Sequence, residues 1–383
     1  MELMHGLSLM GPGFRAFDLS PGGAAGHDRA AGGAAGHDLA TEPEGFMVAM
    51  DGAVRIHFLD WGGPVATADA GAGEERAADT GAASPGSGDV PGVLLIHGVA
   101  RTAWSWASIA RRLRASAHVV AMDLRGHGLS DAPTAGYDPD QLAEDAIAVA
   151  EGTGLLTFAR GPAGTRGPGG RPFVIAGHGY GAVVAAWTAN ALGDRCTGLV
   201  LVDGGWTDLP AETGMTPDEW LAAIAEPPEV LSSMSAWLAD REAFDPATWG
   251  ADQERAARTE VVETAAGRVK LAIHRHALAA SVGALWTYEP ASVLPAVQAQ
   301  IVALAARDDD AGRHLEALRE MAAARSAVGR SPIRAASYPG LGHNLMRHVP
   351  DAVAAAIRAA ADPRPSAAAH DGRPLDAASD ASG

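Results

Sequence analysis

The 383-residue chain has a single cysteine, Cys196, which excludes an intramolecular disulfide. So little cysteine fits a reducing compartment, and the apolar run 198–202 after Cys196 predicts a buried, inert thiol. No uninterrupted apolar run approaches the roughly 18 residues that a transmembrane helix needs. Residues 1–17 also lack the basic start and apolar core of a signal peptide. These absences predict a cytoplasmic protein with no membrane partner.

Positive charge is also scarce. Lysine and arginine number 29 against 46 aspartates and glutamates, which gives a formal net charge of −17. This balance argues against nucleic acid as a partner, because a phosphate backbone repels an acidic surface. The glycine clusters lack a dinucleotide fingerprint, and no His-x-x-x-His or paired-cysteine spacing indicates zinc. We therefore expect no cofactor, no metal and a small-molecule partner, whereas the oligomeric state stays open.

Low-complexity sequence occupies both ends of the chain. Residues 1–44 are rich in glycine and alanine and contain a near-repeat around two Gly-His-Asp triplets. Two glycine-rich copies are too few for a stacked repeat fold, so we predict disorder rather than a repeat or a metal site. The tail 362–383 has a similar composition and is also predicted to be disordered.

Between these ends, short apolar runs alternate with helical stretches. Fully apolar strands separated by amphipathic helices predict the α/β class, with a doubly wound, mostly parallel sheet covered on both faces. The predicted strands are 54–59, 93–96, 119–122, 173–176, 199–202 and 301–304, and the predicted helices are 104–114, 138–150, 182–192 and 349–361.

Residues 205–290 interrupt this alternation. They show helical periodicity without a convincing strand, and they are rich in tryptophan. We interpret them as a helical cap inserted over a site, which leaves residues 45–204 and 291–361 as the core. The aromatic and apolar side chains of such a cap suggest a small, largely apolar organic ligand, and core packing explains most of them equally well.

Six short motifs follow one another through the predicted core. In chain order they are Asp51-Gly52 with Ile56-His57-Phe58 and Asp60-Trp61-Gly62, Leu94-Leu95-Ile96-His97-Gly98-Val99, Met122-Asp123-Leu124-Arg125-Gly126-His127-Gly128-Leu129-Ser130-Asp131, Gly177-His178-Gly179-Tyr180-Gly181, Leu201-Val202-Asp203-Gly204 and Gly340-Leu341-Gly342-His343. Together they resemble the α/β-hydrolase superfamily, over roughly residues 46–361. The resemblance implies that fold and a triad of nucleophile, acid and histidine in this chain order.

The nucleophile of that family is missing here. The family places a serine on a strained strand-to-helix turn, the nucleophile elbow, with glycines two residues before and two after it. This chain keeps Gly177 and Gly181 but has Gly179 at the nucleophile position. Glycine adopts the turn's backbone with little strain, whereas a residue with a Cβ incurs about 1–3 kcal/mol. We therefore expect the turn without acyl-enzyme chemistry.

The resemblance also implies roles for other residues. His343 matches the catalytic histidine and would act as a general base, and the backbone N–H groups of Val99 and Tyr180 match the oxyanion donors. His178 would pack beneath the elbow without a catalytic role. Three further motif residues are expected to be structural: His97, Arg125 and His127.

The acid that partners His343 has three candidates. The family usually places it after the strand 301–304, where Asp309 fits best by register and Asp308 comes next. Asp203 is the third, because some family members place the acid one strand earlier. A plain solvated acidic turn is the structural alternative for residues 308–310.

Three functions are compatible with this pattern. The first is a hydrolase-like protein that acts through His343 without covalent catalysis. The second is a ligand-binding or regulatory pseudoenzyme that uses the capped pocket. The third is a serine ester hydrolase in variant form, with Gly179 in place of its serine. The retained His343 and loop glycines favour the first.

Overall fold

The structure, a computed structural model, describes residues 15–16, 41–50, 54–64, 90–156, 159–160, 166–167, 171–306 and 313–362. The predictions of disorder for residues 1–44 and 362–383 fall mostly outside these ranges, as do Asp308 and Asp309. Within the described ranges, no helix is both long enough and apolar enough to cross a membrane.

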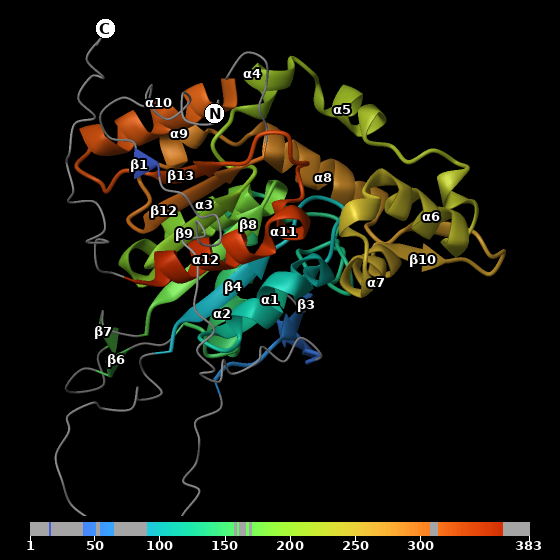
Figure 1. Cartoon of the computed structure of the whole chain (residues 1–383), viewed down its shortest axis with the longest axis horizontal. Helices are drawn as coiled ribbons and strands as arrows, with labels where there is room; N and C mark the ends of the chain where they lie inside the picture. The colour runs from blue at the N-terminus through green and yellow to red at the C-terminus, as the bar shows by residue number, and fades with distance from the viewer. Residues whose placement is uncertain are drawn as a thin grey trace, which may run out of the picture.

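In the described part of the chain, a nine-stranded sheet forms the centre of the fold (Figure 1). Its order is β1-β13-β12-β9-β8-β4-β5-β3-β2; neighbours are parallel from β1 to β5, and β3 and β2 are antiparallel. The strands are β1 (Arg15–Ala16), β2 (Glu44–Ala49), β3 (Arg55–Asp60), β4 (Gly92–Ile96), β5 (His118–Met122), β8 (Phe173–His178), β9 (Gly198–Val202), β12 (Gln300–Ala305) and β13 (Arg334–Ser337). The predicted fold class is confirmed.

All six predicted strands are present, as β3, β4, β5, β8, β9 and β12. The apolar pattern does not predict β2 and β13. The side chains of β2 are mostly exposed at the sheet edge, and β13 reads Arg-Ala-Ala-Ser without a bulky apolar residue. A separate short pair, β6 (Ala159–Arg160) and β7 (Arg166–Gly167), is antiparallel.

Helices cover both faces of this sheet, and the four predicted helices are confirmed among them. On one face lie α2 (Pro139–Gly152) and α3 (Tyr180–Leu192), and on the other α1 (Ala107–Leu113) and α12 (Pro350–Ala361). The remaining helices of the core are α9 (Pro290–Val293), α10 (Arg313–Ala327) and α11 (Leu345–His348), with short 3-10 turns at η2 (Ala103–Trp106) and η4 (Gly193–Arg195).

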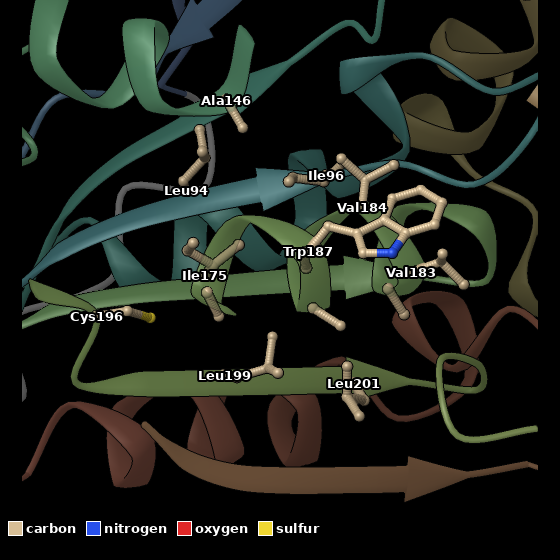
Figure 2. Packing of buried hydrophobic residues seen from close by; sticks show 14 of the residues in the cluster. Leu94, Ile96, Ala146, Ile175, Val183, Val184, Trp187, Cys196, Leu199 and Leu201 are labelled. Carbon is tan, nitrogen blue, oxygen red and sulfur yellow. The ribbon is translucent and has the colours of Figure 1, made fainter. Parts of the chain in front are cut away.

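Alternate side chains of the central strands fill two apolar cores. Leu94 and Ile96 of β4 pack with Val184 of α3 in the cluster of Figure 2. Val93 and Leu95, which alternate with Leu94 and Ile96 along β4, belong to the opposite core with α1 and α12. Strands buried on both faces explain why the sequence reads as continuous apolar runs rather than as polar–apolar alternation.

Residues 205–290, here called the inserted segment, connect β9 to α9. They form α4 (Leu209–Thr213), α5 (Pro217–Ala223), α6 (Met234–Phe244), α7 (Ala251–Thr259) and α8 (Arg275–Trp286), with 3-10 turns η5 (Val230–Ser232) and η6 (Pro246–Thr248). The expectation of helices alone is wrong at β10 (Val261–Glu263) and β11 (Val269–Leu271), which pair as a hairpin. Each strand has only three residues, too few to show a period-2 pattern. The buried Trp237 packs with Val261 and Val269 in a small core of this segment.

Polar pairs join the inserted segment to the core. Arg101 of the core pairs with Glu260 at 2.9 Å, and Thr102 and Thr259 share a 2.7 Å hydrogen bond. On a second side, His348 lies 3.4 Å from Asp245. The segment is thus held over the carboxyl ends of the strands, at the right of the sheet in Figure 1.

The flanking glycines of the elbow provide a first prediction. A Cβ built on Gly181 would lie 2.3 Å from the carbonyl oxygen of Ile96. Because backbone atoms cannot yield easily, Gly181→Ala is expected to lower the free energy of unfolding by at least about 3 kcal/mol in urea titrations. The matched control is Gly283→Ala in α8, where the new Cβ meets nothing within 4 Å. The control should be neutral or stabilise by up to about 1 kcal/mol; equal losses in both variants would contradict the packing argument.

Candidate active site

The predicted elbow is present between β8 and α3. Gly179 separates the two elements with φ 53° and ψ −117°, a backbone that favours glycine. Its N–H donates to the Val202 carbonyl at 3.1 Å. Gly177 lets strand and helix meet, since a Cβ there would lie 2.1 Å from the Gly181 oxygen. The elbow therefore persists although Gly179 has no nucleophilic side chain.

His343 lies directly over the elbow. A Cβ built on Gly179 would be 3.1 Å from His343 Nε2. The other ring nitrogen, Nδ1, donates to Asp203 Oδ2 at 2.5 Å. With its proton on Nδ1, the neutral imidazole presents the lone pair of Nε2 toward Gly179. This is the orientation a general base requires.

Asp203, the third candidate from the sequence, is the carboxylate that the structure places beside His343. It follows β9, its side chain is buried, and its Oδ1 accepts the backbone N–H of Ala306 at 2.9 Å. Its φ of 45° is unfavourable for a residue with a Cβ, the kind of local strain that clusters at functional sites. Asp308 and Asp309 lie outside the described residues, so the structure places neither of them.

His178 holds the main chain of His343, a contact the sequence does not predict. Its Nε2 donates to the His343 carbonyl at 3.0 Å, and the two rings are 4.3 Å apart. Burial keeps the pKa of His178 well below its usual value, so this ring stays neutral. The two residues are 165 positions apart in the chain, and no local pattern could reveal the bond.

The two N–H groups expected to hold an oxyanion line the same cavity as Gly179 and His343. Val99 follows β4, and Tyr180 is the first residue of α3. Within the described residues, neither backbone N–H donates a hydrogen bond to another protein group. Their placement at the cavity is compatible with the predicted role.

The remaining motif residues build the loops around the site. The buried Asp123 accepts hydrogen bonds from the Ala103 N–H at 2.7 Å and from His57 Nδ1 at 2.8 Å. His97 Nε2 accepts the Leu124 N–H at 3.0 Å. Arg125 pairs with the buried Asp145 at 2.6 Å. Burial lowers the pKa of His127 to about 3, which keeps that ring neutral. These contacts fit a scaffolding role.

A cavity of about 370 Å³ lies between the elbow and the inserted segment. Its floor contains Gly179, His343 and Asp203. Apolar side chains of the inserted segment form much of its wall: Leu209, Trp220, Ile224, Trp237, Leu271, Leu278 and Leu285. In the described part of the chain, no three His, Cys, Asp or Glu side chains are arranged to hold a metal ion.

Residues 93–356 match the model of the alpha/beta hydrolase family, more than half of the chain, and the protein belongs to this family. It is 30% identical over 116 residues to 2-(acetamidomethylene)succinate hydrolase of Mesorhizobium japonicum, a match to 30% of this chain and 36% of that protein. An uncharacterized Mycobacterium tuberculosis protein is 30% identical over 119 residues, 31% of this chain and 30% of its own length. The chain thus spans about a third of the curated relatives it matches.

Solved structures share the fold over most of the chain. E-2-(acetamidomethylene)succinate hydrolase superposes with a TM-score of 0.59 at 17% identity, covering 83% of this chain and 98% of the other. The thioesterase domain from the curacin biosynthetic pathway gives 0.57 at 18% identity, with 83% and 99% covered. At these identities the likeness shows the α/β-hydrolase fold alone.

Proposed function

We propose that this family member is a hydrolase-like protein in which His343 acts as a general base without a covalent serine nucleophile. One observation carries the proposal: His343 Nε2 faces Gly179 while Nδ1 donates to the buried Asp203. Asp203 is our first choice for the carboxylate that orients His343, and Asp309 remains the second. A histidine with this support is a competent base even where the attacking residue is absent.

In the proposed reaction, a water molecule above Gly179 takes the place of the serine hydroxyl. Nε2 of His343 accepts one proton of that water as its oxygen attacks the substrate carbonyl carbon. The N–H groups of Val99 and Tyr180 hold the resulting oxyanion. Collapse of the tetrahedral intermediate expels the leaving group, which takes the proton back from His343. The Asp203 carboxylate stabilises the imidazolium between these two steps.

We assign to the inserted segment the role of a cap that supplies substrate contacts. Its leucines, Ile224 and two tryptophans face the cavity, which supports a small substrate with a largely apolar body. The succinate in the name of the Mesorhizobium relative is not transferred to this chain, because that match covers about a third of either protein.

Ligand binding without catalysis is the second candidate. The cavity has the size of a small-molecule site, and glycine relieves the strain that a serine would place on the elbow. A pocket kept after the nucleophile is lost suits a receptor or regulatory protein as well as an enzyme.

Turnover of an activated ester separates the two candidates. Wild-type protein should hydrolyse p-nitrophenyl hexanoate without becoming labelled by a fluorophosphonate probe, since no serine hydroxyl stands at the elbow. His343→Ala should reduce kcat/KM by about 10²–10⁴-fold. The control is His274→Ala, which removes an exposed histidine of the inserted segment. Probe labelling at the elbow would exclude both candidates, and turnover unchanged in His343→Ala would eliminate the general base.

A further inference from the structure

We infer that this cavity rejects anionic substrates and selects an uncharged ester, thioester or amide. The inference deepens the proposed function by naming the charge class of its substrate. Besides histidines, the charged side chains in the described part of the cavity wall are Asp203, Glu212, Glu226, Glu260, Arg101 and Arg241. Four carboxylates face two guanidinium groups, so the wall is net negative when the histidines are neutral.

Each carboxylate already has a partner within hydrogen-bonding distance. Arg101 Nη1 donates to both oxygens of Glu260, at 3.0 and 2.9 Å. His314 Nε2 lies 2.7 Å from Glu212 Oε1. Asp203 is engaged by His343, as described above. Asp203, Glu212 and Glu260 thus each have a partner within the cavity wall.

Arg241 also has carboxylate partners, although its buried Nε has no hydrogen-bond partner in the described part of the chain. Its Nη2 lies 2.6 Å from Glu226 and 2.9 Å from Asp240, and its guanidinium stacks over the Trp237 ring at 4.2 Å. A substrate carboxylate that paired with Nη2 of Arg241 would have to displace Glu226. It would then leave a partly buried carboxylate without its cation, a costly exchange.

An incoming anion therefore meets a described wall of net negative charge, in which each guanidinium group already pairs with a carboxylate. An uncharged substrate meets neither obstacle, and the apolar residues of the inserted segment can receive its body. Like-charge juxtaposition of this kind is a common device for excluding unwanted ligands. The wall thus disfavours anions in the space in front of His343, and we call this effect the charge filter.

A binding experiment tests the filter independently of turnover. The two probes are 2-octanone and 7-oxooctanoate, ketones of equal chain length that differ in a terminal methyl or carboxylate. Calorimetry at low ionic strength should show the carboxylate binding at least about tenfold more weakly. Equal affinities would overturn the inference whatever the protein catalyses.

Glu226→Gln then identifies the cause of the difference. The variant frees Arg241 from one carboxylate, so binding of 7-oxooctanoate should strengthen about tenfold or more while 2-octanone stays within twofold. The matched control is Glu229→Gln, which makes the same charge change at an exposed residue outside the cavity lining. The ratio of the two ketone affinities should change in Glu226→Gln and not in Glu229→Gln. An unchanged ratio in Glu226→Gln, or an equal change in both variants, refutes the charge filter.

A parallel assay links the filter to catalysis. The kcat/KM for the anionic mono-p-nitrophenyl ester of adipic acid should be lower than that for p-nitrophenyl hexanoate, by the same factor as the two ketone affinities differ. Glu226→Gln should raise the kcat/KM of the anionic ester again. Absence of His343-dependent turnover would end the proposed function, whereas the ratio of the two ketone affinities would still decide the charge filter. Failure of both ketones to bind would end the charge filter and leave the proposed function to the ester assay.

Discussion

Gly179→Ser is expected to turn the protein into a serine esterase that reacts covalently with fluorophosphonates. The backbone at position 179 already has the conformation of a nucleophile elbow, and Nε2 of His343 faces it. We expect kcat/KM for p-nitrophenyl hexanoate to rise by at least on the order of 10³-fold over wild type. The substitution should also destabilise the fold by about 1–3 kcal/mol, because a Cβ enters a strained region.

The new side chain requires one adjustment. At 3.1 Å, the contact of a Cβ with Nε2 is closer than usual, so His343 must shift by a few tenths of an ångström. It can do so because its side chain is 41% exposed and stands on a loop. Gly179→Ala is the matched control, since it adds the same Cβ without the hydroxyl. An alanine variant as active as the serine variant would show that the gain does not come from a nucleophile.

Asp203→Asn is expected to lower the His343-dependent turnover of wild-type protein by about 10⁴-fold. The amide retains an oxygen for the Ala306 N–H but no longer holds the proton of His343 on Nδ1, so Nε2 loses its role as acceptor. Circular dichroism and urea denaturation would establish that the variant folds.

Asp309→Asn decides between the two acids. If Asp203 orients His343, the Asp309 variant should keep its turnover within about threefold of wild type, a surface-residue effect. The opposite result is a large loss of turnover in Asp309→Asn with turnover retained in Asp203→Asn. It would identify Asp309, the position that register suggests, as the partner of His343.

The sheet topology explains why the sequence does not identify the aspartate that pairs with His343. β9 and β12 are parallel neighbours, with Val202 paired to Leu304, so their carboxyl ends emerge side by side. An aspartate after either strand can reach the same histidine. The apolar runs of the local sequence predict both strands, yet the sequence contains nothing that chooses between Asp203 and the acidic residues 308–310 that follow β12.

Short-range patterns predict the elbow and the strands better than they predict long-range contacts. Gly177, Gly179 and Gly181 specify the turn through the backbone angles and close approaches that glycine permits. The bond from His178 to the His343 carbonyl, by contrast, depends on tertiary packing alone. The β10–β11 hairpin escapes prediction because three-residue strands carry too little periodicity.

The way the inserted segment joins the sheet has an evolutionary consequence. The segment leaves the core after β9 and returns at α9, before β12. It has its own small core around Trp237, and charged pairs such as Arg101–Glu260 connect it to the rest of the fold. Mutations in its small core around Trp237 are therefore expected to change the cavity wall without disturbing the packing of the sheet. The ligand specificity of the cavity and the stability of the sheet can therefore evolve at different rates in one chain.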